Sequence, residues 1–225
     1  HPGAFPVLVL DLAKTGAGPV EVRIEGFQRG EQQQHRRRSG NDTLTGTANA
    51  DVIYGNGGVD TIAAGAGKDM VILSASGLTA LAATTNNATV NGGTDINTLK
   101  LSGINLNLDL TNTTVMGKLD NFTVIDMKQG SGNKFKLGLN EVLALAGGTD
   151  NAATVGVDES KMLVIQGNGG VAYNTVQLMD GVNWTAVTNL GGTSLQSTYG
   201  ASYGFEVGRS YTQYTNGGAN LFVDQ

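Results

Sequence analysis

The chain has 225 residues, of which 40% are hydrophobic and 15% charged, with a formal net charge of −5. The hydrophobic content argues against a wholly disordered chain, and the negative charge argues against broad electrostatic attraction to nucleic acid. Because cysteine is absent, disulfides, thiolate zinc sites and cysteine nucleophiles are excluded, and no apolar stretch approaches the roughly 18 residues of a membrane-spanning helix.

The first 38 residues divide into two segments. Residues 1–27 contain two alternating runs, PVLVLDL and PVEVRIEGF, around a TGAG turn, which predicts the end of an upstream β domain or a hairpin. This segment lacks a basic region and a small-residue cleavage site, so it is a poor signal peptide and the chain is expected to be a fragment or a processed form. Residues 28–38, QRGEQQQHRRR, are polar without periodicity and are expected to form a linker.

Residues 39–73 contain a strict repeat of nine. Aspartates stand nine positions apart, and each is followed two positions later by an aliphatic residue. The turns before them are rich in glycine, which adopts backbone angles closed to most residues, and in asparagine, which tolerates positive φ. This is the pattern of a calcium-binding parallel β-roll. The aspartates are Asp42, Asp51, Asp60 and Asp69, followed by Leu44, Ile53, Ile62 and Val71.

The repeat predicts a specific calcium chemistry. Carboxylates that face the carbonyls of tight turns form a cage of hard oxygen ligands suited to Ca²⁺. Because two repeats complete one coil, Asp42 is expected to share an ion with the Asp60 loop and Asp51 with the Asp69 loop, giving two to three ions. GGTDINTL at 92–99 is a candidate fifth loop. The predicted metal-site residues are Asp42, Asp51, Asp60, Asp69, Asn49, Gly58, Gly67, Asp95 and Asn97. The alternative is an ordinary turn-rich β protein, which the strict spacing disfavours.

The rest of the chain predicts an all-β fold with one or two short helices. Helical spacing at 74–87 and the run NEVLALAGG at 140–148, with Asn140 as N-cap, predict the helices. INLNLDL at 104–110 alternates like a half-buried strand. Residues 39–159 are therefore expected to hold the roll and its β extension. Between 160 and 225, strands separated by NG and GG turns predict an antiparallel β cap with its own aromatic core.

No catalytic set is evident, and we expect the chain not to be an enzyme. The histidines are His1 and His35, which do not make a Ser/His/Asp triad credible. Paired carboxylates such as Asp158–Glu159 fit turns better than glycosidase chemistry. Trp184 and the tyrosines near the C-terminus are compatible with a carbohydrate- or peptide-binding face, but core packing is the stronger expectation.

The array resembles the repeats-in-toxin (RTX) family, whose members are secreted through bacterial type I machines. The segment 117–147, GKLDNFTVIDMKQGSGNKFKLGLNEVLALAG, is similar to the segment after the repeats in giant RTX adhesins, and 174–187 and 211–225 look like their closing strands. The resemblance covers 39–225, and the arginine-rich entry at 36–38 departs from it. It implies a short right-handed calcium-binding parallel β-roll, continued by a β-solenoid or β-sandwich cap.

The resemblance also implies a function. The chain is expected to be the calcium-folded C-terminal module of a type I-secreted adhesin, extracellular or at the cell surface of a Gram-negative bacterium, with a role in biofilms. Its expected partners are calcium ions, the secretion machinery during export, and a surface ligand through upstream domains or further copies of itself. The alternatives are a self-assembling surface-layer or extracellular matrix subunit and the non-catalytic secretion tail of an RTX enzyme.

Overall fold

Strands predominate in the computed structural model, which describes residues 20–22, 34–36, 40–147, 158–167, 174–179 and 183–225. In the array, a strand begins at or just after each aspartate, and successive strands alternate between two parallel sheets. Leu44 pairs with Ile62 in one sheet and Ile53 with Val71 in the other, so strands two repeats apart are paired, as the repeat predicts. They are β3 (Asp42–Thr45), β4 (Val52–Gly55), β5 (Thr61–Ala63) and β6 (Met70–Leu73).

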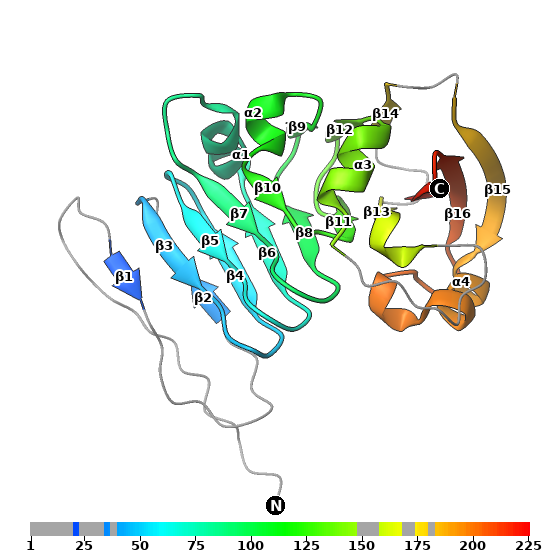
Figure 1. Ribbon diagram of the computed structural model, residues 1–225, viewed down its shortest axis with the longest axis horizontal. Helices are drawn as coiled ribbons and strands as arrows, with labels where there is room; N and C mark the ends of the chain where they lie inside the picture. Colours follow the sequence, from blue (N-terminus) through cyan, green and yellow to red (C-terminus); the bar gives the residue numbers. More distant parts are fainter. Residues whose placement is uncertain (1–19, 23–33, 37–39, 148–157, 168–173, 180–182) are drawn as a thin grey trace, which may run out of the picture.

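Both sheets extend beyond the array (Figure 1). The added strands are β1 (Val20–Val22), β2 (Gln34–Arg36), β7 (Thr89–Asn91), β8 (Thr98–Leu101), β10 (Leu119–Asp120) and β11 (Val124–Asp126). The first sheet has the order β1-β3-β5-β7-β10, and the second runs from β2 through β4, β6 and β8 to β11. β2 lies inside the segment expected to be a linker. A polar segment can form this strand because its parallel pairing with β4 uses the backbone and places no demand on side-chain polarity.

After β6 the coil lengthens from 18 to 28 residues, since Ile62 pairs with Val90. Helix α1 (Ala75–Ala82) occupies the extra length, within the segment whose spacing predicts helical turns. Helix α2 (Thr113–Met116) follows, and β9 (Asn107–Asp109), β12 (Lys134–Leu137) and β14 (Thr175–Leu178) form a third parallel sheet. The alternation predicted for 104–110 holds from Leu106 onward, whereas Ile104 is exposed in the turn before β9.

One hydrophobic core runs through the coils. The four aliphatic residues that follow the aspartates are at most 1% exposed, which confirms their predicted inward position. Residues of later coils stack on them in register, with Val90 on Ile62 and Leu99 on Val71. The third sheet contributes Leu108 and Phe135 to the same core. Each coil therefore adds one layer of apolar side chains to a continuous column.

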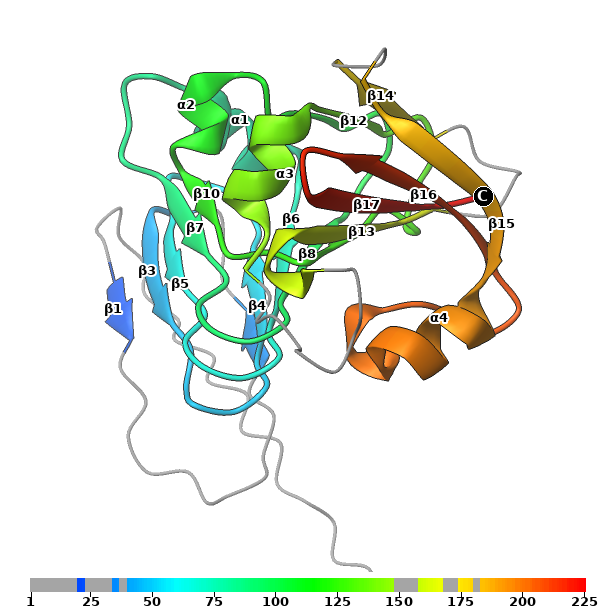
Figure 2. The same cartoon turned by 45° about the vertical axis from the view of Figure 1, so that its right-hand side comes forward.

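The C-terminal part extends the second sheet (Figure 2). After the short 3₁₀ turn η1 (Glu159–Lys161), strand β13 (Met162–Gln166) pairs in parallel with β11 and with β17 (Ala219–Asp224). β16 (Ser210–Asn216) and β15 (Thr185–Gly191) then add in antiparallel order. The antiparallel cap expected over 160–225 is thus present as β15, β16 and β17, whereas β13 and β14 continue the parallel stacking.

A second, aromatic core covers the outer face of this sheet, in agreement with the separate core predicted there. Phe205 makes edge-on contacts with Tyr211 and Phe222, at ring-centroid distances of 5.2 and 5.1 Å. Helix α4 (Gly192–Tyr199) and the 3₁₀ turn η2 (Ala201–Tyr203), neither of which the sequence pattern predicts, bring Leu195 and Tyr203 into it. Tyr203 and Tyr211 are buried, so core packing accounts for these tyrosines.

Helix α3 (Leu139–Leu145) begins differently from the prediction. Its N-cap is Gly138, whose N–H donates to Glu141 Oε2 at 2.8 Å, and Asn140 is an exposed residue of the first turn. The assignment of Asn140 as N-cap is therefore wrong, because the helix begins two residues earlier, where the Glu141 carboxylate can reach back to the free N–H of Gly138.

This geometry gives a testable difference between neighbouring residues. Glu141→Ala is expected to lower the free energy of unfolding by about 0.5–2 kcal/mol, the usual cost of losing an N-terminal helix cap. Asn140→Ala is expected to change it by no more than about 0.5 kcal/mol, as for other exposed positions. Urea denaturation monitored by circular dichroism measures both, and a larger cost for Asn140→Ala would contradict the assignment.

Several expectations fall outside the described residues. The first strand predicted within 1–27 and most of the linker at 28–38 are among them, and the domain boundaries at 27, 38 and 159 stay predictions. Within the part of the chain that the structure describes, no helix is long and apolar enough to cross a membrane.

Candidate calcium site

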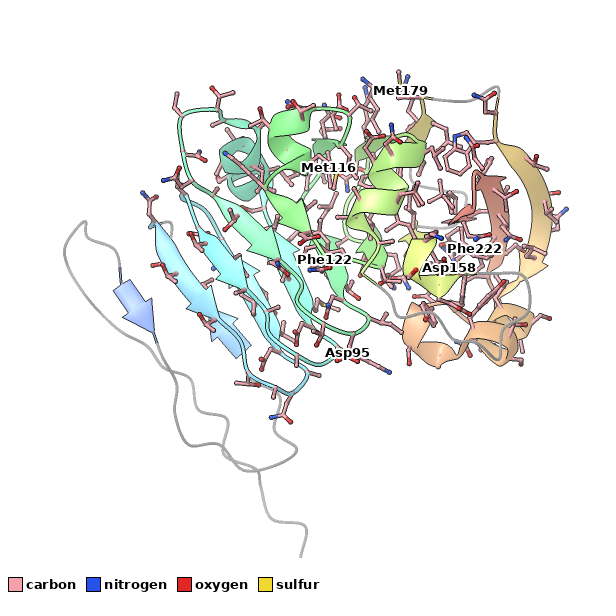
Figure 3. All side chains as sticks on the ribbon, in the orientation of Figure 1. Asp95, Met116, Phe122, Asp158, Met179 and Phe222 are labelled. Carbon is pink, nitrogen blue, oxygen red and sulfur yellow. The ribbon has the colours of Figure 1, made fainter. Side chains whose placement is uncertain are left out.

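The array aspartates lie in loops at the edges of the two sheets. The loops that join β3 to β4, β5 to β6 and β7 to β8 nest at the lower edge in Figure 1 and carry Asp51, Asp69 and Asn97. Asp42 and Asp60 begin or directly precede β3 and β5, at the opposite edge. Asp95 is labelled in the lower loops of Figure 3. The fold thus sorts the predicted site residues into two groups, as expected for alternate repeats.

Within each group, a side chain of one coil holds the backbone of the coil before it. Asp60 Oδ1 accepts the N–H of Asp42 at 3.0 Å, and Asp69 Oδ1 accepts the N–H of Asp51 at 2.8 Å. Asn97 Oδ1 accepts the N–H of Asp69 at 2.9 Å, so the candidate fifth loop continues the lower group. The structure therefore brings together the pairs 42/60 and 51/69 that the spacing predicts to share an ion.

The turn glycines allow these loops to stack closely. Gly58 and Gly67 have φ of +112° and +106°, which is left-handed backbone that favours glycine. A Cβ on Gly58 would lie 2.1 Å from the carbonyl oxygen of Gly40, and a Cβ on Gly67 would lie 2.7 Å from the carbonyl carbon of Asn49. Asn49 thus meets the next loop through its backbone, and its side chain is exposed. Each of these glycines therefore lies directly against a backbone carbonyl group of the loop before it.

The carboxylates of the lower group are buried. Asp51 and Asp69 are 1% and 2% exposed, and Asp69 Oδ2 has no hydrogen-bond partner among the described residues. The pKa of Asp69 is raised to about 7, chiefly by burial and also by the charges of Asp51 and Asp95, while the hydrogen bond from the Asp51 N–H opposes the rise. The pKa of Asp60 is likewise raised to about 6, chiefly by burial and also by the charge of Asp42, while the hydrogen bond from the Asp42 N–H opposes the rise. A buried carboxylate of this kind needs a proton or a cation.

The raised pKa values predict how stability without metal depends on pH. Both groups have folded-state pKa values above the ordinary 3.8, so their protonated forms stabilise the fold, and this contribution is lost as pH rises through about 6 and 7. In EDTA the melting temperature should fall between pH 5 and pH 7.5, and the increase caused by CaCl₂ should be larger at pH 7.5. A melting temperature that rises over this window in EDTA, and does so equally in Asp69→Asn, would contradict the assignment.

The donor set fits calcium. No group of three or more His, Cys, Asp or Glu side chains that could hold a metal is present among the described residues. A site here would combine carboxylates of two coils with loop carbonyls, which are the hard oxygen ligands that Ca²⁺ accepts in flexible geometry. Asp95, at a φ of +69°, accepts the N–H of Gly67 through Oδ2 at 3.1 Å and adds negative charge beside Asp69.

Some residues of these loops escape a search for aspartates. Asn41 Oδ1 accepts the N–H of Val59 at 2.8 Å and joins the upper loops. Thr47 donates its hydroxyl to Asp51 Oδ2 at 3.0 Å, which fixes the carboxylate within its own loop. Both residues could have been found from their offsets to the array aspartates, because Asn41 directly precedes Asp42 and Thr47 lies four residues before Asp51.

Comparisons with known proteins agree with this geometry. Residues 38–71 match the family model of the RTX calcium-binding nonapeptide repeat, in four copies. The repeats indicate calcium binding, and proteins that carry them are typically secreted. The match includes all four aspartates and their loops, and it begins at Arg38, so the first copy contains part of the arginine-rich entry. No curated protein and no solved structure matches the chain.

Proposed function

We propose that the two alternating parallel sheets of the array form a short right-handed calcium β-roll that folds when calcium binds. The observation that carries this proposal is the buried Asp69 carboxylate, which ties down Asp51 with one oxygen and leaves the other without a hydrogen-bond partner among the described residues. The loop carbonyls beside it offer no positive charge. A calcium ion between the 46–51 and 64–69 loops would bind the second Asp69 oxygen and the loop carbonyls together.

The energetics make calcium a folding switch. Two carboxylates about 4 Å apart repel by ~1–4 kcal/mol over plausible effective dielectrics, and the array strands are three or four residues long. Extracellular calcium modules bind with Kd on the order of 10⁻⁴–10⁻³ M, and each ion at tenfold excess over Kd adds ~1.4 kcal/mol. The array is therefore poorly ordered at cytosolic calcium levels and folds outside the cell.

We further propose that the chain is the non-enzymatic C-terminal module of a type I-secreted adhesin on a Gram-negative cell surface, with a role in biofilms. The sequence similarity of 117–147, 174–187 and 211–225 to adhesin segments supports this context. The same similarity supports export through the type I machinery before folding. Binding to a surface ligand would then belong to domains upstream of this module.

A self-assembling surface-layer or matrix subunit is the second candidate. β15 forms the edge of the second sheet, its seven residues carry no charge, and nearly all are exposed. An exposed, uncharged edge strand offers backbone groups for pairing with another chain. Calcium-dependent polymerisation of the purified chain, followed by light scattering, would favour this candidate over the adhesin module.

The calcium proposal has a direct test. Adding millimolar CaCl₂ to EDTA-treated protein should raise both the β-sheet circular dichroism signal and the melting temperature, whereas equal MgCl₂ should do much less because Mg²⁺ sheds its water reluctantly. Isothermal titration calorimetry on the same sample gives the number of ions bound. If calcium changes neither the spectrum nor the melting temperature, the proposal fails.

A further inference from the structure

Three asparagines beyond the array hold the same place in their coils as the array aspartates. Each directly precedes a parallel strand and lies two residues before an apolar side chain of the first core. They are Asn97 before β8, Asn133 before β12 and Asn174 before β14, with Leu99, Phe135 and Val176 as the apolar residues. As in the array, the backbone N–H of the residue after each asparagine donates to a backbone carbonyl of the preceding coil. Met70 donates to the carbonyl of Asp51, Thr98 to that of Asp69 and Thr175 to that of Asn133, all at 2.8 Å.

The side-chain oxygen of each asparagine repeats the contact that the aspartates make. Asn133 Oδ1 accepts the N–H of Leu106 at 2.9 Å, and Asn174 Oδ1 accepts the N–H of Asn133 at 2.9 Å. Asn97 Oδ1 accepts the N–H of Asp69 at the same distance. Because a backbone N–H fixes the accepting atom as oxygen, the other terminal atom of each asparagine is the amide nitrogen.

That second atom separates the asparagine coils from the aspartate coils. Asn97 Nδ2 lies among three backbone carbonyl oxygens, 3.0 Å from that of Thr94 and 3.4 Å from those of Asp95 and Asn121. Asn97 is fully buried, so water does not compete for these carbonyls. The counterpart of this nitrogen in the preceding coil is Asp69 Oδ2, which when ionised cannot donate to carbonyls and which has no hydrogen-bond partner within the described ranges.

The other two asparagines make the same kind of contact. Asn133 Nδ2 donates to the carbonyl of Gly103 at 3.3 Å, and Asn174 Nδ2 donates to the carbonyl of Met127 at 2.8 Å. In all three coils a neutral donor stands where a carboxylate would require a cation. The amide gives the loop carbonyls a positive hydrogen and introduces no charge that needs balancing.

We propose that the amide nitrogens of Asn97, Asn133 and Asn174 take the place of calcium in their coils, so that these coils close without metal. Calcium is then confined to the aspartate loops. Asn97 follows the last of these loops, where it forms hydrogen bonds and does not bind the ion. The inference rests on the proposed function, since it takes the aspartate coils as the calcium-binding part. It divides the molecule into a calcium-dependent segment and a calcium-independent one.

Exchanging the two side chains tests this proposal by calorimetric stoichiometry. Asn97→Asp should bind one calcium ion more than the wild type and melt at a lower temperature than the wild type in EDTA. Asn97→Ala should bind the wild-type number of ions and melt lower both in calcium and in EDTA. A loss of one ion in Asn97→Ala, or an Asn97→Asp variant with wild-type stoichiometry and wild-type melting in EDTA, would overturn the proposal.

Hydrogen exchange on the wild type provides a second readout that needs no substitution. In EDTA, the amides of Leu106 and Asn133, which asparagines hold, should keep their protection, while those of Asp42 and Asp51, which aspartates hold, should exchange much faster than in calcium. Equal loss of protection in all four would overturn the inference even if calcium binding is confirmed. A wild type that binds no calcium and shows equal protection with and without it would instead refute the proposed function.

Discussion

Replacing Asp69 by alanine is expected to lower the melting temperature in millimolar calcium by roughly 5–15 °C. The substitution removes a proposed calcium ligand, worth ~1.4 kcal/mol at tenfold excess of the ion. It also removes the acceptor of the buried Asp51 N–H, which costs about 1–3 kcal/mol. For a domain of this size each kcal/mol corresponds to about 2–4 °C. Differential scanning calorimetry with and without calcium measures the effect.

The comparison with EDTA separates the metal from the hydrogen bond. Without calcium, alanine also removes a carboxylate whose pKa burial raises to about 7, so the cost should be smaller than in calcium. Asp120→Ala is the matched control, because it removes an equal charge from an exposed position of β10. Equal losses for Asp69→Ala in calcium and in EDTA would mean that the carboxylate is structural and does not bind the ion.

The array could be located from the sequence because its chemistry repeats at a fixed interval. Strands of three or four residues carry little propensity of their own, yet the interval of nine fixes which residues face inward, and Leu44 and Val71 are buried as predicted. The pairing of Asp51 with Asp69 followed from counting two repeats per coil. Such counting works only while every coil has the same length.

Beyond the candidate loop at 92–99, the individual coils could not be placed from the sequence because their length varies. Asn133 contacts Leu106 across 27 residues and is itself held by Asn174 across 41, so no period marks them. Asparagine also replaces aspartate there, which hides the relation to the calcium loops. The sequence preserves only a local pattern, a polar residue followed two positions later by an apolar one. This pattern is too short to identify a coil by itself.

The aromatic core shows a different limit of sequence reasoning. The cluster of aromatic residues after 173 predicted a separate core, and Phe205 and Phe222 form its centre. The helix α4 that closes it could not be predicted from the run GTSLQSTY, whose serines and threonines have weak helix propensity. Tertiary packing of Leu195 against this core supplies what local propensity lacks.

The close stacking of the array loops leads to a last prediction, for Gly58. Its φ of +112° disfavours any side chain, and a Cβ there would lie 2.1 Å from the carbonyl oxygen of Gly40. Gly58→Ala therefore combines backbone strain of about 1–3 kcal/mol with an overlap costing about 1–3 kcal/mol. The melting temperature should fall by roughly 5–20 °C at about 2–4 °C per kcal/mol, and the apparent calcium affinity should fall because the loops must separate.

Substitutions at two other glycines separate the cost of backbone strain from the cost of steric overlap. Gly200 has a φ of +92° but nothing within 4 Å of its Cβ position, so Gly200→Ala should show the strain alone and leave calcium affinity unchanged. Gly191, at a φ of −71°, also has open space around it, and Gly191→Ala should change stability by no more than about 0.5 kcal/mol. If Gly58→Ala costs no more than Gly200→Ala and binds calcium as the wild type does, the 40–42 and 55–60 loops do not stack closely enough to share an ion. The pairing of Asp42 with Asp60 as joint ligands would then have to be abandoned.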